Sequence, residues 1–245
     1  PCTASCRPGI AASGRWAVVA ERPSTALVAG ATGLVGTQLV RLLLAPSRYE
    51  RVVTLVRRTT PVLGPPHEVC VVDFSRLETF APPFEKADVY CALGTTMRQA
   101  GSKEAFREVD YGYVVRLAEL AAAGGARSFG LVSATSASEK SPFFYSRVKG
   151  EAERAVAAAG LPSVAIFRPS LLTGPRTEQR RGEQIAEAVL RPLTPLLRGP
   201  LAGLRPIAAE TVARAMAHVV PQAHPGVHVY EPEAIRETAV NVVRA

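Results

Sequence analysis

Residues 25–45 read "TALVAGATGLVGTQLVRLLLA", and this stretch decides the fold. A short apolar run precedes glycines at positions 30, 33 and 36, and apolar residues at helical spacing come after them. Glycine allows a tight turn and a close approach of two backbone segments. The first turn of a helix presents N–H groups and a positive dipole end, which together favour a phosphate. The stretch therefore predicts a strand, a turn and a helix that begins at an anion-binding site.

Six apolar runs with strand character alternate with helical segments from residue 25 to residue 169. Helices are expected over residues 33–45, 103–125 and 143–160. Alternating strands and helices imply right-handed crossovers and a parallel sheet. We therefore expect an α/β protein with a Rossmann-type doubly wound parallel sheet, whose ligands bind at the edge where the strands end. The expected strands are "TALVAG", "RVVTLV", "HEVCVVDF", "ADVYCAL", "SFGLVSA" and "PSVAIFRP".

The pattern divides the chain into three parts within one structural domain. Residues 1–24 have no regular periodicity and are interpreted as a flexible N-terminal extension. Residues 25–172 hold the alternating strands and helices and form the Rossmann core. Residues 173–245 begin with a segment rich in Arg, Pro and Gly and are too few for a second full domain. We expect this part to form a small substrate cap over the ligand-binding edge.

Composition restricts the function classes. The chain has 245 residues, 47% hydrophobic, with a formal net charge of +8. The basic residues are scattered instead of clustered on one stripe, so nucleic-acid binding is not expected, whereas anionic ligands are favoured. No apolar run approaches the ~18 residues that span a bilayer. Two cysteines, Cys70 and Cys91, lie in strand-like runs, and we expect buried thiols, no disulfide, no metal site and a cytoplasmic location.

Two arginines at the end of the second strand indicate which dinucleotide the turn would bind. Arg57 and Arg58 come after "VTLV", about 20 residues beyond Gly36, and no acidic residue occurs between Arg51 and Gly64. An acidic residue here would bind a ribose 2′-hydroxyl, whereas arginines match a 2′-phosphate. The sequence therefore predicts NADP(H) as the cofactor, with NAD as the alternative.

Further cofactor contacts are expected where other strands end. Asp73 with Phe74 is predicted to contact adenine, and residues 93–96 are predicted to pass under the diphosphate and ribose. The complete expected set is Gly30, Thr32, Gly33, Leu34, Val35, Gly36, Arg57, Arg58, Asp73, Phe74, Leu93, Gly94, Thr95, Thr96, Tyr145, Lys149 and Pro169.

"SPFFYSRVKGEAE", residues 141–153, holds the candidate proton-transfer residues. Tyr145 and Lys149 are four residues apart and so lie on one helix face. A phenol has a pKa near ~10, and a nearby ammonium lowers it toward neutral pH. A lysine on the nicotinamide ribose would serve both purposes. The strand end "LVSATSAS" supplies hydroxyls to hold a substrate oxygen: Ser133 is the first choice, with Thr135 and Ser136 as further candidates.

These motifs, in this order and followed by "RPSLLTG", resemble the short-chain dehydrogenase/reductase superfamily, in its atypical epimerase/dehydratase-like branch. Residues 88–134 resemble the Tat-interacting-protein-like oxidoreductase subfamily, and the similarity extends over roughly residues 25–220. The resemblance implies a Rossmann-type fold, NADP(H) bound at the glycines and Arg58, and a catalytic set of Ser133, Tyr145 and Lys149. One departure is Asp110, which stands where many relatives carry Asn.

Two functions agree with these motifs. The first is an NADP-dependent oxidoreductase that transfers hydride between nicotinamide and a small carbonyl or alcohol substrate, with Tyr145 as acid and base. The alternative is an NADP(H)-binding regulatory or scaffold protein that turns over little or no substrate and acts on a protein partner.

Overall fold

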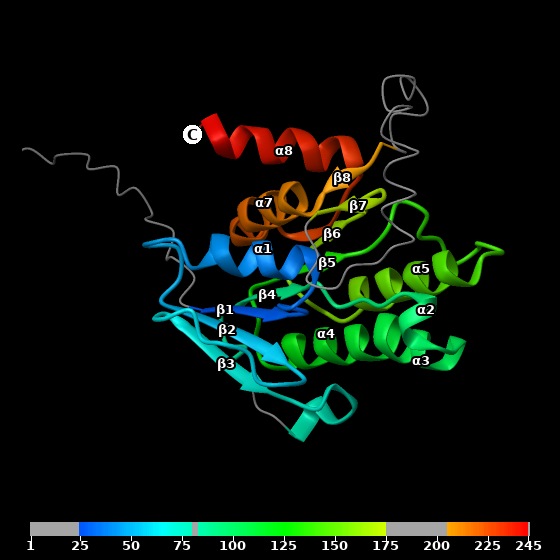
Figure 1. Cartoon of the computed structure of the whole chain (residues 1–245), viewed down its shortest axis with the longest axis horizontal. Helices are drawn as coiled ribbons and strands as arrows, with labels where there is room; N and C mark the ends of the chain where they lie inside the picture. Colours follow the sequence, from blue (N-terminus) through cyan, green and yellow to red (C-terminus); the bar gives the residue numbers. More distant parts are fainter. Residues whose placement is uncertain (1–24, 80–82, 175–204, 245) are drawn as a thin grey trace, which may run out of the picture.

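The computed structural model describes residues 25–79, 83–174 and 205–244 (Figure 1). Seven parallel strands form one sheet in the order β3-β2-β1-β4-β5-β6-β9. This topology confirms the predicted Rossmann-type sheet. The strands are β1 (Thr25–Ala29), β2 (Arg51–Val56), β3 (His67–Val71), β4 (Asp88–Cys91), β5 (Ser128–Val132), β6 (Ser163–Phe167) and β9 (Gly226–Tyr230).

Helices cover both faces of the sheet, as Figure 1 shows. On one face, α1 (Leu34–Leu43) and α7 (Ala209–Val219) bury their apolar sides in one core, and α8 (Pro232–Arg244) packs on α7. On the other face, α4 (Tyr113–Ala123) and α5 (Phe144–Ala157) bury theirs in a second core. The central strands β1, β4, β5 and β6 are therefore buried along their whole length, which explains their continuous apolar sequences.

The helix predicted over residues 103–125 is interrupted by a wider turn. α3 (Lys103–Arg107) leads into a π-helical turn, η2 (Glu108–Gly112), and α4 begins directly after it. A π turn changes the face that each later residue presents, and such turns are frequent at functional sites. In this chain the turn places Asp110 in the interior, with 1% of its surface exposed.

The part of the predicted cap that the structure describes adds to the sheet and its helical layer. Residues 205–244 contain the short strand β8 (Ile207–Ala208), which pairs with β7 (Leu172–Thr173), and then α7, β9 and α8. β9 was not predicted: its "GVHVY" is exposed at the edge of the sheet. Residues 175–204, the rest of the predicted cap after residue 174, and the N-terminal extension at 1–24 lie outside the described residues.

The remaining described elements are short connections. They are the 3₁₀ turns η1 (Phe74–Thr79) and η5 (Val220–Gln222) and the helix α2 (Met97–Ala100). Within the described residues, no helix is long and apolar enough to cross a membrane.

A buried carboxylate organises the edge of the sheet where the strands begin. Asp88 is fully buried at the start of β4, and both of its oxygens accept hydrogen bonds. Arg127 donates to both oxygens at 3.0 and 2.7 Å, Ser128 Oγ donates at 2.6 Å and Tyr49 Oη at 2.7 Å. Burial raises the pKa of Tyr49 and of Tyr90, so both phenols stay neutral and can donate. The network joins β4, β5 and the segment before β2 at the edge opposite the predicted site.

We expect Asp88→Ala to lower the free energy of unfolding by about 3 kcal/mol, since it leaves the partly buried Arg127 guanidinium without its counter-ion. Urea unfolding followed by circular dichroism measures this change. Glu85→Ala, an exposed acid in the loop before β4, is the matched control and should change stability by less than about 0.5 kcal/mol. Equal losses in the two variants would contradict a structural role for the Asp88 network.

Candidate functional site

All seven strands end at the same edge of the sheet, and the predicted site residues lie just beyond these ends. The chain passes from β1 to β2 and β3 on one side, and β4, β5 and β6 lie on the other. The strand order therefore reverses between β1 and β4, which is where doubly wound sheets bind ligands. Gly30 comes after β1, residues 92–96 after β4, and Ser133 after β5.

The glycine-rich turn is closed so tightly that side chains are excluded from it. Gly30 has a φ of +84°, and a Cβ there would lie 2.4 Å from the carbonyl of Ala92. A Cβ on Gly36 would lie 2.1 Å from the carbonyl oxygen of Gly30. Gly33 donates its N–H to Gly30 at 3.0 Å and precedes α1, whose first turn has no acidic residue and no side-chain cap. The amino end of α1 thus faces the edge of the sheet with its N–H groups available for a phosphate.

The neighbours of the glycines divide into exposed and buried positions. Thr32 is exposed and Leu34 is half-buried, so both can meet a ligand through their side chains. Val35 is buried in the core beside α1, which leaves only its backbone for such a contact.

Arg57 and Arg58 are exposed directly after β2. Within the described residues, neither forms an ion pair. The loop that they begin is anchored by His67, whose Nδ1 accepts the N–H of Leu63 at 3.0 Å. The Nε2 of His67 therefore carries the proton and donates to Thr54 Oγ1 at 3.1 Å. The two guanidinium groups thus stand unpaired on an anchored loop beside the glycine turn.

The two predicted adenine contacts, Asp73 and Phe74, differ in their exposure. Asp73 is exposed, and hydrogen bonds from the hydroxyl and N–H of Ser75 lower its pKa. Phe74 is 3% exposed and stacks on Tyr113 with ring centroids 5.7 Å apart. The Phe74 ring belongs to the core, so only its backbone remains for a ligand.

The loop after β4 contacts the π turn. Thr95 donates its N–H to Asp110 Oδ2 at 2.8 Å. Thr96 caps α2 by accepting the N–H of Gln99 at 3.3 Å, and Gly94 is exposed. Leu93 is half-buried and packs against the core beneath α4 and α5.

Tyr145 and Lys149 project from the first turns of α5 and differ in exposure. Tyr145 is 39% exposed, and its ring packs 5.6 Å from that of Phe106. Lys149 is 6% exposed, and its Nζ lies 2.8 Å from Asp110 Oδ1. Burial alone would lower the pKa of Lys149, but the charges of Asp110 and Tyr145 outweigh it and raise that pKa. Lys149 is therefore an ammonium at neutral pH.

The three candidate hydroxyls after β5 are distinguished by their hydrogen bonds. Thr135 Oγ1 donates to the carbonyl of Arg168 at 3.0 Å, and Ser136 Oγ accepts from Ser146 Oγ at 3.0 Å. Ser133 is 6% exposed, and its Oγ has no hydrogen-bond partner in the part of the chain that the structure describes. Among the described residues, the other buried side-chain polar atom without a hydrogen bond is Asp110 Oδ1, which instead faces the Lys149 ammonium as an ion pair. Unpartnered buried atoms such as Ser133 Oγ are rare in folded proteins.

Asp110 was not among the predicted site residues. Its helical segment looks regular in sequence, and a π turn has no residue signature that would have revealed the inward direction of its carboxylate. Pro169, which was predicted, accepts the N–H of Thr135 through its carbonyl at 3.1 Å. It therefore supports the loop that carries the hydroxyls.

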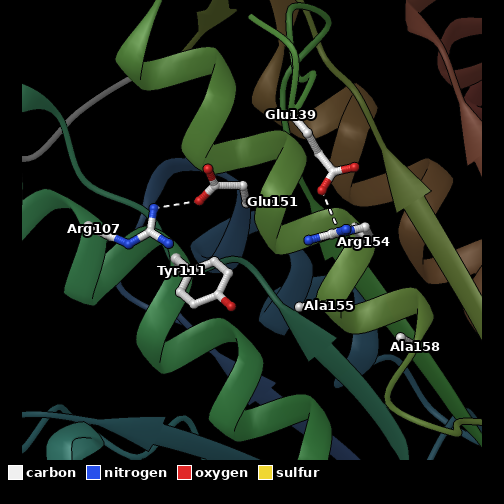
Figure 2. A pocket seen from close by; sticks show the side chains of 7 residues that line it. All are labelled: Arg107, Tyr111, Glu139, Glu151, Arg154, Ala155 and Ala158. Carbon is white, nitrogen blue, oxygen red and sulfur yellow. Dashed lines mark hydrogen bonds and ion pairs between the residues drawn. The ribbon is translucent and has the colours of Figure 1, made fainter.

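A separate surface pocket lies on the outer side of α5 (Figure 2). It has a volume of about 570 Å³, and its charged residues pair with one another, Arg107 with Glu151 and Arg154 with Glu139. None of the predicted site residues lines it. The pocket is therefore distinct from the edge where the glycine turn and Ser133 lie.

The family model for the NAD dependent epimerase/dehydratase family matches residues 26–231. Protein HTATIP2 of Rattus norvegicus is 38% identical over 163 residues, which are 65% of this chain and 67% of that protein. Protein FMP52, mitochondrial, of Debaryomyces hansenii is 30% identical over 199 residues, which are 80% of this chain and 87% of that protein.

Solved structures with the same fold include MoeE5 in complex with UDP-glucose and NAD. Its TM-score is 0.65 at 18% identity, over 90% of this chain and 82% of that one. The dTDP-glucose 4,6-dehydratase DesIV of Streptomyces venezuelae, with NAD and TYD bound, has a TM-score of 0.64 at 20% identity, over 90% of this chain and 80% of that one. At these identities the two structures establish a shared fold.

We expect the anchor at His67 to make stability depend on pH. Burial lowers the pKa of His67, so the unfolded chain takes up a proton at a higher pH than the folded chain does. The stabilisation from neutral His67 is complete above ~6.5, the pKa of histidine in the unfolded chain, and it is lost as pH falls from there toward the pKa in the folded chain. Urea unfolding at pH 7.5 and 5.5 should show that the free energy of unfolding falls more between these two pH values in the wild type than in His67→Gln. His228→Gln, at an exposed histidine, is the control and should show the same fall as the wild type. If the free energy of unfolding falls no more in the wild type than in His67→Gln, His67 is not the source of the pH dependence.

Proposed function

The chain belongs to the NAD-dependent epimerase/dehydratase family, and from this premise we propose that it is an NADP-dependent oxidoreductase. It transfers hydride between the nicotinamide and a carbonyl or alcohol substrate, with Tyr145 as acid and base. The observation that carries this proposal is the buried Ser133 Oγ, which has no partner among the described residues and lies at the same edge of the sheet as Tyr145 and Lys149. An unsatisfied donor at this edge is the group that a substrate oxygen would satisfy.

The residues present fit a dinucleotide. The turn at Gly30, Gly33 and Gly36 is packed too closely for side chains, so backbone groups line it, and α1 begins directly after it without a side-chain cap. The backbone N–H groups there would hold the pyrophosphate. Residues 93–96 would line the path toward Lys149.

The preference for NADP rests on the unpaired arginines after β2. Arg57 and Arg58 would bind a 2′-phosphate through charge-assisted hydrogen bonds, which are roughly twice as strong as neutral ones. A ribose 2′-hydroxyl would instead require an acceptor, and the exposed carboxylate of Asp73 at the neighbouring strand end is turned to Ser75. The anchored loop thus favours a phosphate over a hydroxyl.

In the direction of reduction, a bound nicotinamide would supply a hydride to the carbonyl carbon of the substrate. Ser133 Oγ orients the carbonyl oxygen by donating a hydrogen bond to it. Tyr145 Oη gives its proton to that oxygen as the new C–H bond forms, and the ammonium of Lys149 stabilises the resulting phenolate. Tyr145 is 39% exposed, so solvent can return its proton. The oxidation of an alcohol runs through the same steps in reverse.

The alternative function is NADP(H) binding with little or no turnover, in a protein that regulates a protein partner. The pairing of Lys149 with Asp110 favours it, because a lysine held by a buried carboxylate is less available to a phenolate. This function predicts tight NADPH binding, no substrate oxidation or reduction, and a partner whose affinity depends on the nucleotide.

Tyr145→Phe and Ser133→Ala should each lower NADPH-dependent carbonyl reduction by roughly 10²- to 10⁴-fold, because each removes a group that acts on the substrate oxygen. NADPH oxidation is followed by its absorbance with aliphatic and aromatic aldehydes, ketones and nucleotide sugars. NADPH binding, measured by fluorescence, should persist in both variants. Tyr111→Phe, whose ring packs under Arg107 on the outer side of α5, is the control and should keep wild-type rates. Unchanged rates in Tyr145→Phe would remove this residue from the mechanism.

Arg57→Ala combined with Arg58→Ala should weaken NADPH binding by roughly 10- to 100-fold, from the loss of one or two hydrogen bonds to a charged group. NADH binding should not change, since NADH lacks the 2′-phosphate. Isothermal titration with both nucleotides measures this difference, and Arg41→Ala, at an exposed arginine of α1, is the control for loss of a surface arginine elsewhere. An equal effect on both nucleotides would argue against the 2′-phosphate site.

We retain a cytoplasmic location as part of the proposal, although the FMP52 relatives carry the word mitochondrial in their names. Cell fractionation with markers for both compartments decides between them.

A further inference from the structure

We infer that His67 is a positioning residue for cofactor choice, because its neutral imidazole holds the loop that carries the two arginines for the 2′-phosphate. Protonation of the ring would release this loop, which spans residues 57–66 and begins with Arg57 and Arg58. The inference rests on the proposed function, because it assumes that these arginines select NADP(H). It goes beyond the effect of this histidine on stability, since it concerns which of two nucleotides the protein binds.

Both ring nitrogens of His67 have partners that fit the neutral form. Nδ1 accepts the N–H of Leu63 at 3.0 Å, so it carries no proton. Nε2 lies 3.1 Å from Thr54 Oγ1, whose own hydrogen is donated to the carbonyl of Glu68 at 3.3 Å. Nε2 is therefore the donor in its pair. A second proton, on Nδ1, would place two donors against each other at the contact with Leu63.

The loop that carries the arginines has few other attachments. It returns along the length of β2, six residues or about 20 Å, whereas its own residues, 57–66, can extend to about 33 Å. In the part of the chain that the structure describes, residues 57–62 make no hydrogen bond and no ion pair. Val62 and Leu63 are 58% and 59% exposed, so their burial contributes little. The N–H of Leu63 is therefore the first point after β2 at which a hydrogen bond fixes the loop.

Among the described residues, no acidic side chain compensates an imidazolium at this position. His67 pairs with Val52, whose side chain lies in the core beside α1. Besides the two arginines of the loop, the titratable groups on α1, β2 and β3 and directly before β2 are Arg41, Glu50, Arg51, Glu68 and Cys70. Glu50 is exposed, and Glu68 pairs with Arg51 at 2.8 Å. Burial therefore lowers the pKa of His67 without an opposing charge.

Acidification should act on NADP(H) and spare NAD(H). When His67 takes up a proton, the contact with Leu63 is lost and the two guanidinium groups are no longer held in place. The contacts that weaken are those to the 2′-phosphate, and NAD(H) has a hydroxyl there. Since the ring in the folded protein titrates below ~6.5, the preference for NADP(H) should be complete at pH 7.5 and should decline as pH falls below that pKa.

The decisive experiment compares NADP⁺ and NAD⁺ binding by isothermal titration at pH 7.5 and 5.0 in the wild type, His67→Gln and His228→Gln. Gln replaces the ring by an amide that has an oxygen for the Leu63 N–H and a donor for Thr54, and it does not titrate. On acidification, the ratio of the NAD⁺ to the NADP⁺ dissociation constant should fall roughly tenfold further in the wild type than in His67→Gln, as expected for one hydrogen bond to a charged group. His228→Gln, at an exposed histidine, should follow the wild type.

The comparison also separates the histidine from the ligand. The 2′-phosphate itself titrates near pH ~6, but this contribution is the same in every variant and cancels between them. Groups of the protein that act on both nucleotides cancel in the ratio of the two dissociation constants. A further fall that is confined to proteins with His67 is therefore the signature of this ring, and a residue with a purely structural role would weaken both nucleotides alike.

His67→Asn covers the case in which His67→Gln does not fold, because Asn Oδ1 stands where Nδ1 stood and can accept the Leu63 N–H. Circular dichroism at both pH values establishes that each variant is folded. A ratio that falls equally in the wild type and in the folded variant would overturn the inference and leave the proposed function standing. A wild type that binds NADP⁺ no more tightly than NAD⁺ at pH 7.5 would overturn the proposed preference for NADP, and this inference with it.

Discussion

The close approach of α1 to the end of β1 is the constraint on which the rest of the structure depends. With a Cβ on Gly36 only 2.1 Å from the Gly30 carbonyl oxygen, the helix can begin here only if both residues are glycine. This contact sets the height of α1 above the sheet, and α7 and α8 then pack outward from α1. It also leaves the amino end of α1 open toward the strand ends, where Ser133 follows β5, Lys149 projects from α5 and the loop after β4 begins.

The two edges of the sheet treat polar groups in opposite ways. At the edge where the strands begin, Asp88 has partners for both oxygens, and Tyr49, Arg127 and Ser128 are committed to it. At the edge where the strands end, Ser133 Oγ has no partner and Arg57 and Arg58 have no counter-ion within the described residues. A buried polar group without a partner costs stability, and Ser133 Oγ lies where a ligand would satisfy it, whereas the two exposed arginines are solvated. The first edge maintains the fold, whereas the second retains capacity for binding.

Elements that depend on local pattern could be predicted from the sequence. The six core strands and the turn at Gly30 were recognisable because burial on both faces and the need for glycine leave few residue choices. β9 was not predicted because its short "GVHVY" is exposed at the sheet edge and comes after a segment without clear periodicity. Phe74 was assigned to the ligand although it stacks on Tyr113, since sequence position gives the strand end and not the direction of a ring. Asp110 was noted in the sequence only as a departure from Asn, and the direction of its carboxylate became visible only through the π turn and its distance to Lys149.

The π turn has a consequence for how this protein would change under selection. A wide turn gives up the regular α-helical hydrogen bonding that would be available to residues 108–112, and in this chain it directs one carboxylate inward. Selection for thermal stability alone has no reason to preserve that direction, since stabilising changes commonly regularise functional irregularities. A lineage or a library that needed only the folded chain would be expected to straighten this helix early. The irregular turn is therefore a feature that a demand for stability alone would not favour.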